Sequence, residues 1–313
     1  MYSVTNVVLP IFALILVGYL CRRTGRLGST AAAEINKFVV WLGLPSLLFQ
    51  VTAGSTWAQI WQPGFLLAFS GGCLAVYLLT LAYRLRRQAD GHPRLVDASI
   101  DSLSASYANT GFIGIPLCTL VFGPEGLEPA LIASILVVCV LFTLAVVCIE
   151  IGLQTEKSLH HALLKVFKAL AKNPLIVSPI LGACWALGGQ PLPGPVHQLL
   201  NLLGNATTPC ALVSLGLFLA QEQQGSSRGA TPIVLIKLIG QPAITWVIAF
   251  PLLHLPPLWA NSALLLSALP TGTGPYMLAE FYQREAAVVS RVILVSTLGS
   301  LVTLSICLYL LGL

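Results

Sequence analysis

Few side chains of this 313-residue chain could take part in chemistry, because charged residues make up only 9% of it. Asp97, Asp101, Lys237 and Glu280 fall within or at the ends of apolar stretches. The two aspartates lie one helical turn apart on one segment, whereas an aspartic protease needs two carboxylates that share a proton and come from separate segments. The sequence shows no phosphate-binding motif, and its 5 histidines and 8 cysteines show no metal-ligand spacing. These patterns predict no enzyme, no cofactor and no metal site.

Two stretches rich in glycine and proline could form a binding site instead. They cover residues 106–116 and 268–275, each near the middle of an apolar segment. Glycine loosens a helix, and proline lacks the amide hydrogen and clashes with the preceding turn. We therefore expect both helices to be unwound at mid-membrane, where bare backbone must line a polar cavity or pack against protein.

Each break would create the N-terminus of a half-helix, with Pro116 or Pro275 in its first turn. Two such ends would attract an anion through free amides and the positive ends of the helix dipoles, and the opposing carbonyl ends could hold a cation. The alternative is a pair of proline kinks with a packing role. The candidate substrate-binding residues are Asn109, Thr110, Gly111, Gly114, Pro116, Pro270, Thr271, Gly272, Thr273 and Pro275.

Charges within apolar segments are costly, so they are usually paired or functional. Asp101, Lys237 and Glu280 are candidates for coupling or gating, and Asp101 and Lys237 are expected at similar depth, where they could pair. A structural ion pair or a position lining a cytoplasmic vestibule would explain them equally well. A further polar set could line the cavity or simply form interhelical hydrogen bonds: Gln50, Asn201, Asn205, Thr207 and Thr208.

The elements that must position these residues are membrane helices. The composition is 56% hydrophobic, with a mean hydropathy of +0.86. Charged residues make up 9% of the chain, whereas soluble domains carry about 25%. Ten segments are long and apolar enough to span a bilayer. They are 4–21, 31–52, 64–83, 96–121, 128–151, 173–189, 197–220, 231–253, 258–283 and 287–311. The sequence therefore predicts an all-α integral membrane protein.

Basic residues set the predicted topology. Of the 16 lysines and arginines, only Lys37, Lys237 and Arg291 fall within spans. The others all follow odd-numbered spans, which places those connections in the cytoplasm and both termini outside. The net charge of +5 is thus a topology signal and no sign of nucleic-acid binding. Residues 152–172 read as a cytoplasmic amphipathic helix between two halves, 1–151 and 173–313.

The two halves share features at nearly constant spacing. Thr110-Gly111 before Pro116 matches Thr271-Gly272 before Pro275, and Leu44-Pro45 matches Thr208-Pro209. Since five spans put the second half into the membrane inverted, the pattern favours a 5+5 inverted repeat, which is common in secondary transporters.

Three motifs resemble the auxin efflux carrier family. They are Asn109-Thr110-Gly111-Phe112-Ile113-Gly114-Ile115-Pro116-Leu117, Ala268-Leu269-Pro270-Thr271-Gly272-Thr273-Gly274-Pro275-Tyr276 and Asn173-Pro174-Leu175-Ile176. The long cytoplasmic loop of the plant members is absent, so the chain is similar to the compact bacterial type that includes malonate carriers. The resemblance implies the bile acid/auxin transporter fold, with crossed helices 4 and 9 in a moving domain and spans 1, 2, 6 and 7 in a scaffold that forms a homodimer. It also implies that Asn109 binds a carboxylate, while Gly111 replaces a bulkier residue of the plant motif.

The sequence thus predicts a secondary active transporter of the cytoplasmic membrane that moves a small organic anion, malonate-like or auxin-like, by elevator-type alternating access. One alternative is a sodium- or proton-coupled carrier of the bile-acid symporter or cation-antiporter type, which would need a carboxylate-containing ion site at mid-membrane. Another is a membrane sensor with a degenerate transport fold. Lipid, substrate anion and a second copy of the chain are the expected partners, without nucleic acid.

Overall fold

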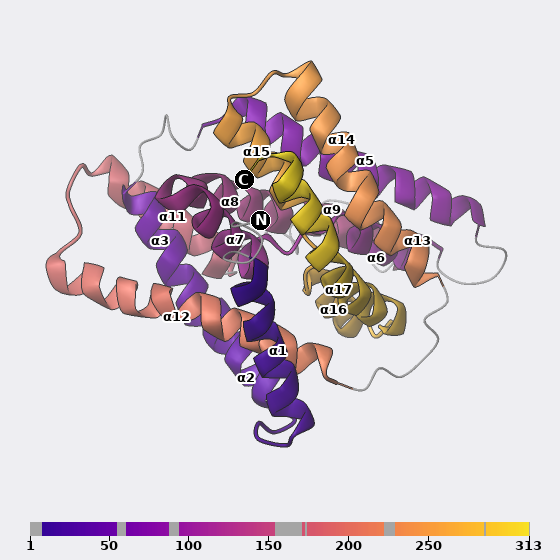
Figure 1. The fold of residues 1–313 in the computed structure, drawn as a ribbon, viewed down its shortest axis with the longest axis horizontal. Helices are drawn as coiled ribbons and strands as arrows, with labels where there is room; N and C mark the ends of the chain where they lie inside the picture. The colour runs from indigo at the N-terminus through magenta and orange to yellow at the C-terminus, as the bar shows by residue number, and fades with distance from the viewer. Residues whose placement is uncertain are drawn as a thin grey trace.

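The structure is a computed structural model that describes residues 8–54, 61–87, 94–153, 171–172, 174–221, 229–284 and 286–312. Within these ranges the regular structure is helical, apart from one isolated β-bridge (Figure 1). The α-helices of the first half are α1 (Leu9–Arg23), α2 (Ala31–Phe38), α3 (Leu44–Gly54), α5 (Pro63–Arg87), α6 (Arg94–Ser106), α7 (Ile115–Phe122), α8 (Leu127–Leu136) and α9 (Phe142–Leu153). Those of the second half are α11 (Pro174–Leu187), α12 (Gly194–Leu219), α13 (Ala230–Leu235), α14 (Gln241–Val247), α15 (Pro257–Ser267), α16 (Gly274–Phe281) and α17 (Ala287–Leu310).

Helices occupy all ten predicted apolar segments in the described ranges. π-helical turns join α2 to α3, α8 to α9 and α13 to α14, so each pair continues as one rod. Among the described residues, six helical stretches are long and apolar enough to cross a bilayer: Ala31–Gly54, Pro63–Arg86, Thr110–Leu136, Gly194–Leu219, Ala230–Leu252 and Ala287–Leu310. Thr110–Leu136 is interrupted at Gly123, where a φ of 68° ends α7. The chain is a multi-pass membrane protein, while a full set of ten spans in a 5+5 repeat stays a prediction.

The burial pattern of α5 shows what a lipid environment requires of a helix. Phe65, Phe69 and Tyr77 are fully buried, at spacings that put them on one face. Leu67 and Leu78, on the opposite face, nevertheless expose 62% and 55% of their surface. A soluble helix would carry polar residues there, so this face suits contact with acyl chains.

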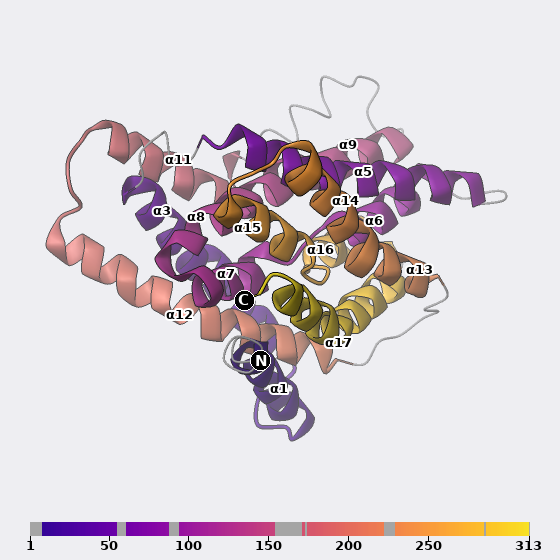
Figure 2. The same ribbon diagram turned by 45° about the horizontal axis from the view of Figure 1, so that its top comes forward.

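The helices pack in two groups. In Figures 1 and 2, α3, α11 and α12 of the first group lie to the left and α5, α6 and α13 of the second group lie to the right, with α7 and α8 beside α3. In the first group, α12 packs against α1, α2 and α3, and α3 packs against α11. Small residues permit these contacts, because a Cβ at Gly18 would overlap the backbone of Val213 and one at Gly216 would overlap the backbone of Ile15. The second group holds α5 to α9 and α13 to α17. The predicted amphipathic linker lies mostly outside the described residues.

Candidate anion-binding site where two broken helices cross

Both predicted breaks are present, and they cross each other. The first separates α6 from a π-helical turn (Thr110–Gly114) that leads into α7, and the second separates α15 from α16. At the crossing, Ala108 and Thr271 form an antiparallel β-bridge. The Asn109 amide donates to the Pro270 carbonyl at 2.9 Å, and the Gly272 amide donates to the Tyr107 carbonyl at 3.0 Å. Unwound backbone far from water is thus satisfied by the other unwound strand.

The C-terminal ends of the first half-helices are capped by the chain itself. The Thr271 hydroxyl donates to the Ser104 carbonyl at 2.7 Å, and Gln241 Nε2 donates to the Ser106 carbonyl at 3.1 Å. At the end of α15, Lys237 Nζ donates to the Ser267 carbonyl at 2.9 Å. Lys237 is 0% exposed, so a side-chain amine stands where the sequence had suggested that carbonyls could hold a cation.

The predicted pair of Asp101 and Lys237 is wrong. Asp101 forms its ion pair with Arg84, at the end of α5. The sequence had assigned Arg84 to the loop after span 3, but its side chain is largely buried beside α6. Lys237 lies instead at the carbonyl end of α15, where its Nζ donates to the Ser267 carbonyl.

Asp97 forms a second link between segments that are far apart in sequence. Arg284 Nε and Nη2 donate to its two carboxylate oxygens at 2.8 and 2.5 Å. Arg284 follows α16, outside the spans, and these hydrogen bonds raise the pKa of its guanidinium. The side chain of Glu280 lies outside the described residues. The Asp97–Arg284 pair therefore ties the two broken helices together at one end, and none of Asp97, Arg284, Asp101 and Arg84 lines the pocket described below.

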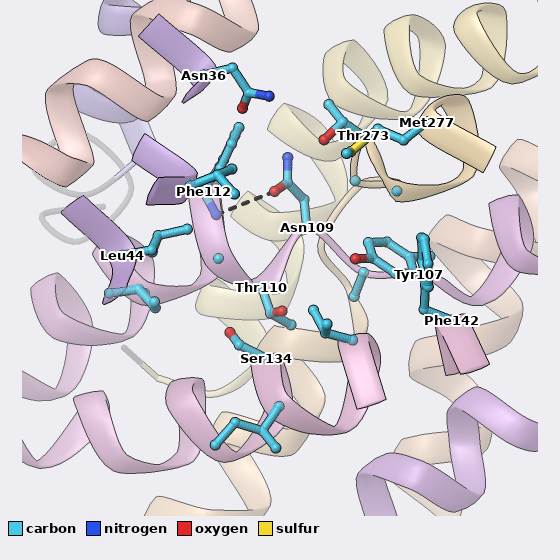
Figure 3. Close-up of a pocket in the computed structure, with 18 of the residues that line it drawn as sticks. Asn36, Leu44, Tyr107, Asn109, Thr110, Phe112, Ser134, Phe142, Thr273 and Met277 are labelled. Carbon is cyan, nitrogen blue, oxygen red and sulfur yellow. Dashed lines mark hydrogen bonds between the residues drawn. The ribbon is translucent and has the colours of Figure 1, made fainter. Parts of the chain in front are cut away.

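A pocket of about 160 Å³ opens beside the crossing (Figure 3). The N-terminal ends of both second half-helices reach it, through Asn109, Thr110 and Gly111 on one side and Thr273 and Gly274 on the other. The remaining residues come from the α2–α3 rod, the α8–α9 rod and nearby positions. They are Asn36, Val40, Leu44, Leu48, Tyr107, Ala108, Phe112, Ile115, Ser134, Ile135, Val138, Phe142, Gly272 and Met277. Among these lining residues none carries a charge.

Asn109 is the polar group best placed to bind a ligand. Its Oδ1 accepts a hydrogen bond from the Phe112 amide at 3.3 Å, which caps the first turn of the helix that leads into α7. Its Nδ2 points into the pocket (Figure 3) and has no hydrogen-bond partner, although the residue is only 5% exposed. Leaving a buried donor unsatisfied costs about 1–3 kcal/mol, and a ligand acceptor would remove that cost.

The structure divides the predicted substrate-binding residues into two sets. Asn109, Thr110, Gly111, Gly272 and Thr273 line the pocket. Gly114, Pro116, Pro270, Thr271 and Pro275 are absent from the lining. For example, Thr271 is fully buried, and a Cβ at Gly114 would meet Leu266 and Leu269 at 2.9 Å.

Sequence reasoning missed Asn36 and Ser134, whose elements lie far from both motifs in the chain. The sequence contained one signal for Asn36, because its amide side chain lies within an apolar span. The predicted polar side from Gln50 and Asn201 is instead an interhelical cluster away from the pocket. Gln50 Nε2 donates to Asn201 Oδ1 at 2.7 Å and contacts His197 at 3.1 Å, which supports the structural alternative.

These features define a membrane transporter, with a small uncharged pocket between crossed half-helices. The chain belongs to the membrane transport protein family, whose model matches residues 3–308. It is 28% identical over 313 residues to the "Putative malonate transporter" of Rhizobium meliloti (strain 1021), covering 99% of this chain and 96% of that one. It is 24% identical over 351 residues to "Auxin efflux carrier component 8" of Arabidopsis thaliana, covering 96% and 95%. An "Uncharacterized transporter" of Methanothermobacter thermautotrophicus is 27% identical over 310 residues, with 96% of each chain covered.

Proposed function

We propose that the protein is a secondary active transporter that carries a small organic anion, with the carboxylate held at the crossing of the broken helices. The observation that carries this proposal is the unpaired Nδ2 of Asn109 between two half-helix N-termini. Amide hydrogens and positive dipole ends bind anions without a basic side chain. The relatives named for malonate and for auxin fit the same chemistry, since both names denote carboxylates.

The position of the pocket supports alternating access by an elevator movement. Asn36, Leu44 and Leu48 belong to the group of α1, α2, α3, α11 and α12, whereas Asn109 and Thr273 belong to the other group. Sliding of the second group along the first would carry the bound anion across the membrane. We further propose a homodimer formed through the first group, in the cytoplasmic membrane with both termini outside.

Sodium or proton coupling is the second candidate. It needs an ion site at the crossing, and the carbonyls of Ser104, Ser106 and Ser267 already accept hydrogen bonds from Thr271, Gln241 and Lys237. The lining of the pocket contains no carboxylate. These contacts favour a carrier that needs no metal cation. The other alternative is a sensor with a transport fold, and transport measurements distinguish it from a carrier.

Current recordings on proteoliposomes adsorbed to a solid support test the proposal. A jump in carboxylate concentration should produce a transient current from the moving negative charge, independent of sodium. Passive entry of the protonated acid is electroneutral, so protein-free liposomes give the baseline. Saturable binding without current would support a proton-coupled carrier or a sensor, and the two differ in whether the lumen acidifies. Neither binding nor current for any tested carboxylate would contradict the proposed function.

A further inference from the structure

We infer that the pocket selects a carboxylate with a single negative charge and an apolar body, and that it discriminates against dicarboxylates. This inference rests on the proposed function and narrows it. The relative named for malonate points to a dicarboxylate instead, so an experiment can distinguish preference for a monocarboxylate from preference for a dicarboxylate.

The balance of charge in the pocket is the first argument. The N-terminus of a helix acts as about half a positive charge. Two such ends reach the pocket, one at Thr110 and one at Gly274. Together they offset about one negative charge, and the lining adds no lysine, arginine or histidine. A dianion would therefore keep about one charge that the pocket does not compensate.

The distribution of hydrogen-bond donors is the second argument. Asn109 and Thr273 stand together at the ends of the half-helices (Figure 3). Asn36, Tyr107 and Thr110 add further polar groups to the lining, whereas Leu44, Leu48 and Val138 make one part of the wall apolar. Ser134 also reaches this wall, but its hydroxyl already donates to the Ala130 carbonyl at 2.8 Å. A second carboxylate placed there would lose its hydration without gaining donors, which is strongly unfavourable.

The size of the pocket sets the size of the apolar body. The pocket has a volume of about 160 Å³. Drug-sized ligands occupy pockets of about 300 Å³ or more. The pocket therefore fits an acid with a short branched or compact chain, such as 3-methylbutanoate. In this acid an isopropyl group takes the place of one carboxylate of malonate, so the two molecules have nearly the same shape.

Calorimetric titration of the purified protein at pH 7.5 with three probes tests the inference. The probes are 3-methylbutanoate, malonate and 3-methylbutanamide, which share one shape and differ in charge. We expect 3-methylbutanoate to bind at least about tenfold more tightly than malonate, a difference of about 1.4 kcal/mol. Malonate binding equally well or better would overturn this inference and leave the proposed function intact. Binding of the neutral amide as tight as that of 3-methylbutanoate would overturn both.

A gain-of-charge variant tests the argument from the charge balance directly. Met277 lines the pocket and is 51% exposed, so Met277→Lys places an ammonium at the rim on a side chain of similar length. We expect the affinity for malonate to rise about tenfold, while Met277→Gln, the uncharged control, gives no such gain. If Met277→Lys folds normally and malonate still binds no better, missing positive charge is not what excludes the dianion, and the inference fails.

Discussion

Two substitutions of Asn109 should separate its two roles. Oδ1 caps a helix by accepting from the Phe112 amide, while Nδ2 faces the pocket without a partner. Asn109→Asp keeps the acceptor and replaces the donor by a second acceptor. A carboxylate at two helix N-termini is itself favourable, so we expect the stability of this variant to be unchanged or higher. Its affinity for 3-methylbutanoate should fall, because the new carboxylate takes the place of the substrate's.

Asn109→Ala removes both roles. The lost cap should cost about 1 kcal/mol of stability. The lost hydrogen bond to a charged group should cost about 1.5–3 kcal/mol of binding, which is about a 10- to 150-fold loss of affinity. Calorimetric titration gives the affinities, and thermal unfolding in the same detergent gives the stabilities. Unchanged affinity in a well-folded Asn109→Asp protein would refute the placement of the anion and leave the crossing as a structural kink.

Three further predictions concern the ion pair, the crossing and the topology. Arg84→Met leaves Asp101 buried without a partner and should cost about 3–5 kcal/mol; the double variant Arg84→Met/Asp101→Leu should recover much of this, and additive losses in the thermal-unfolding cycle would show that the pair does not interact. A Cβ at Gly272 would lie 3.1 Å from the Tyr107 ring and 3.3 Å from Asn109 Cα, so Gly272→Val should cost about 1–3 kcal/mol of stability and weaken binding, whereas Gly28→Val, with open space around it, serves as the control that should do neither. A cysteine introduced at Gly54 or Gln190 should react with a thiol reagent that does not cross the membrane and is added outside intact cells, and a cysteine at Arg86 should not. Labelling of the protein with its native cysteines gives the background. Labelling at the Arg86 position would contradict the topology.

The paired breaks could be predicted because their cause is local. Glycine and proline act on their own turn of helix, so Gly111, Pro116, Gly272 and Pro275 marked the unwound segments from the sequence alone. The family could be predicted for the same reason, since its motifs lie at these segments. The structure adds that the two breaks hydrogen-bond to each other through the amides of Asn109 and Gly272. Unwound backbone that is buried needs such partners.

The partners of individual side chains could not be predicted in the same way. Thr271 and Thr273 are two residues apart in an unwound segment, where helical spacing no longer tells which one faces the pocket. Arg84 was assigned to a loop because α5 extends further than its apolar residues indicate. Lys237 reaches the end of α15 through tertiary packing, which depth along a span does not reveal.

The central claim is that a carboxylate binds at the crossing, and a crystal structure with a bromine-labelled acid tests it most directly. Crystals grown with 3-bromopropanoate should show an anomalous bromine peak in the pocket between Leu48 and Val138. The carboxylate should lie about 3 Å from Asn109 Nδ2 and face the ends of the two half-helices. A bromine peak at another site, with the pocket free of the acid, would contradict the account.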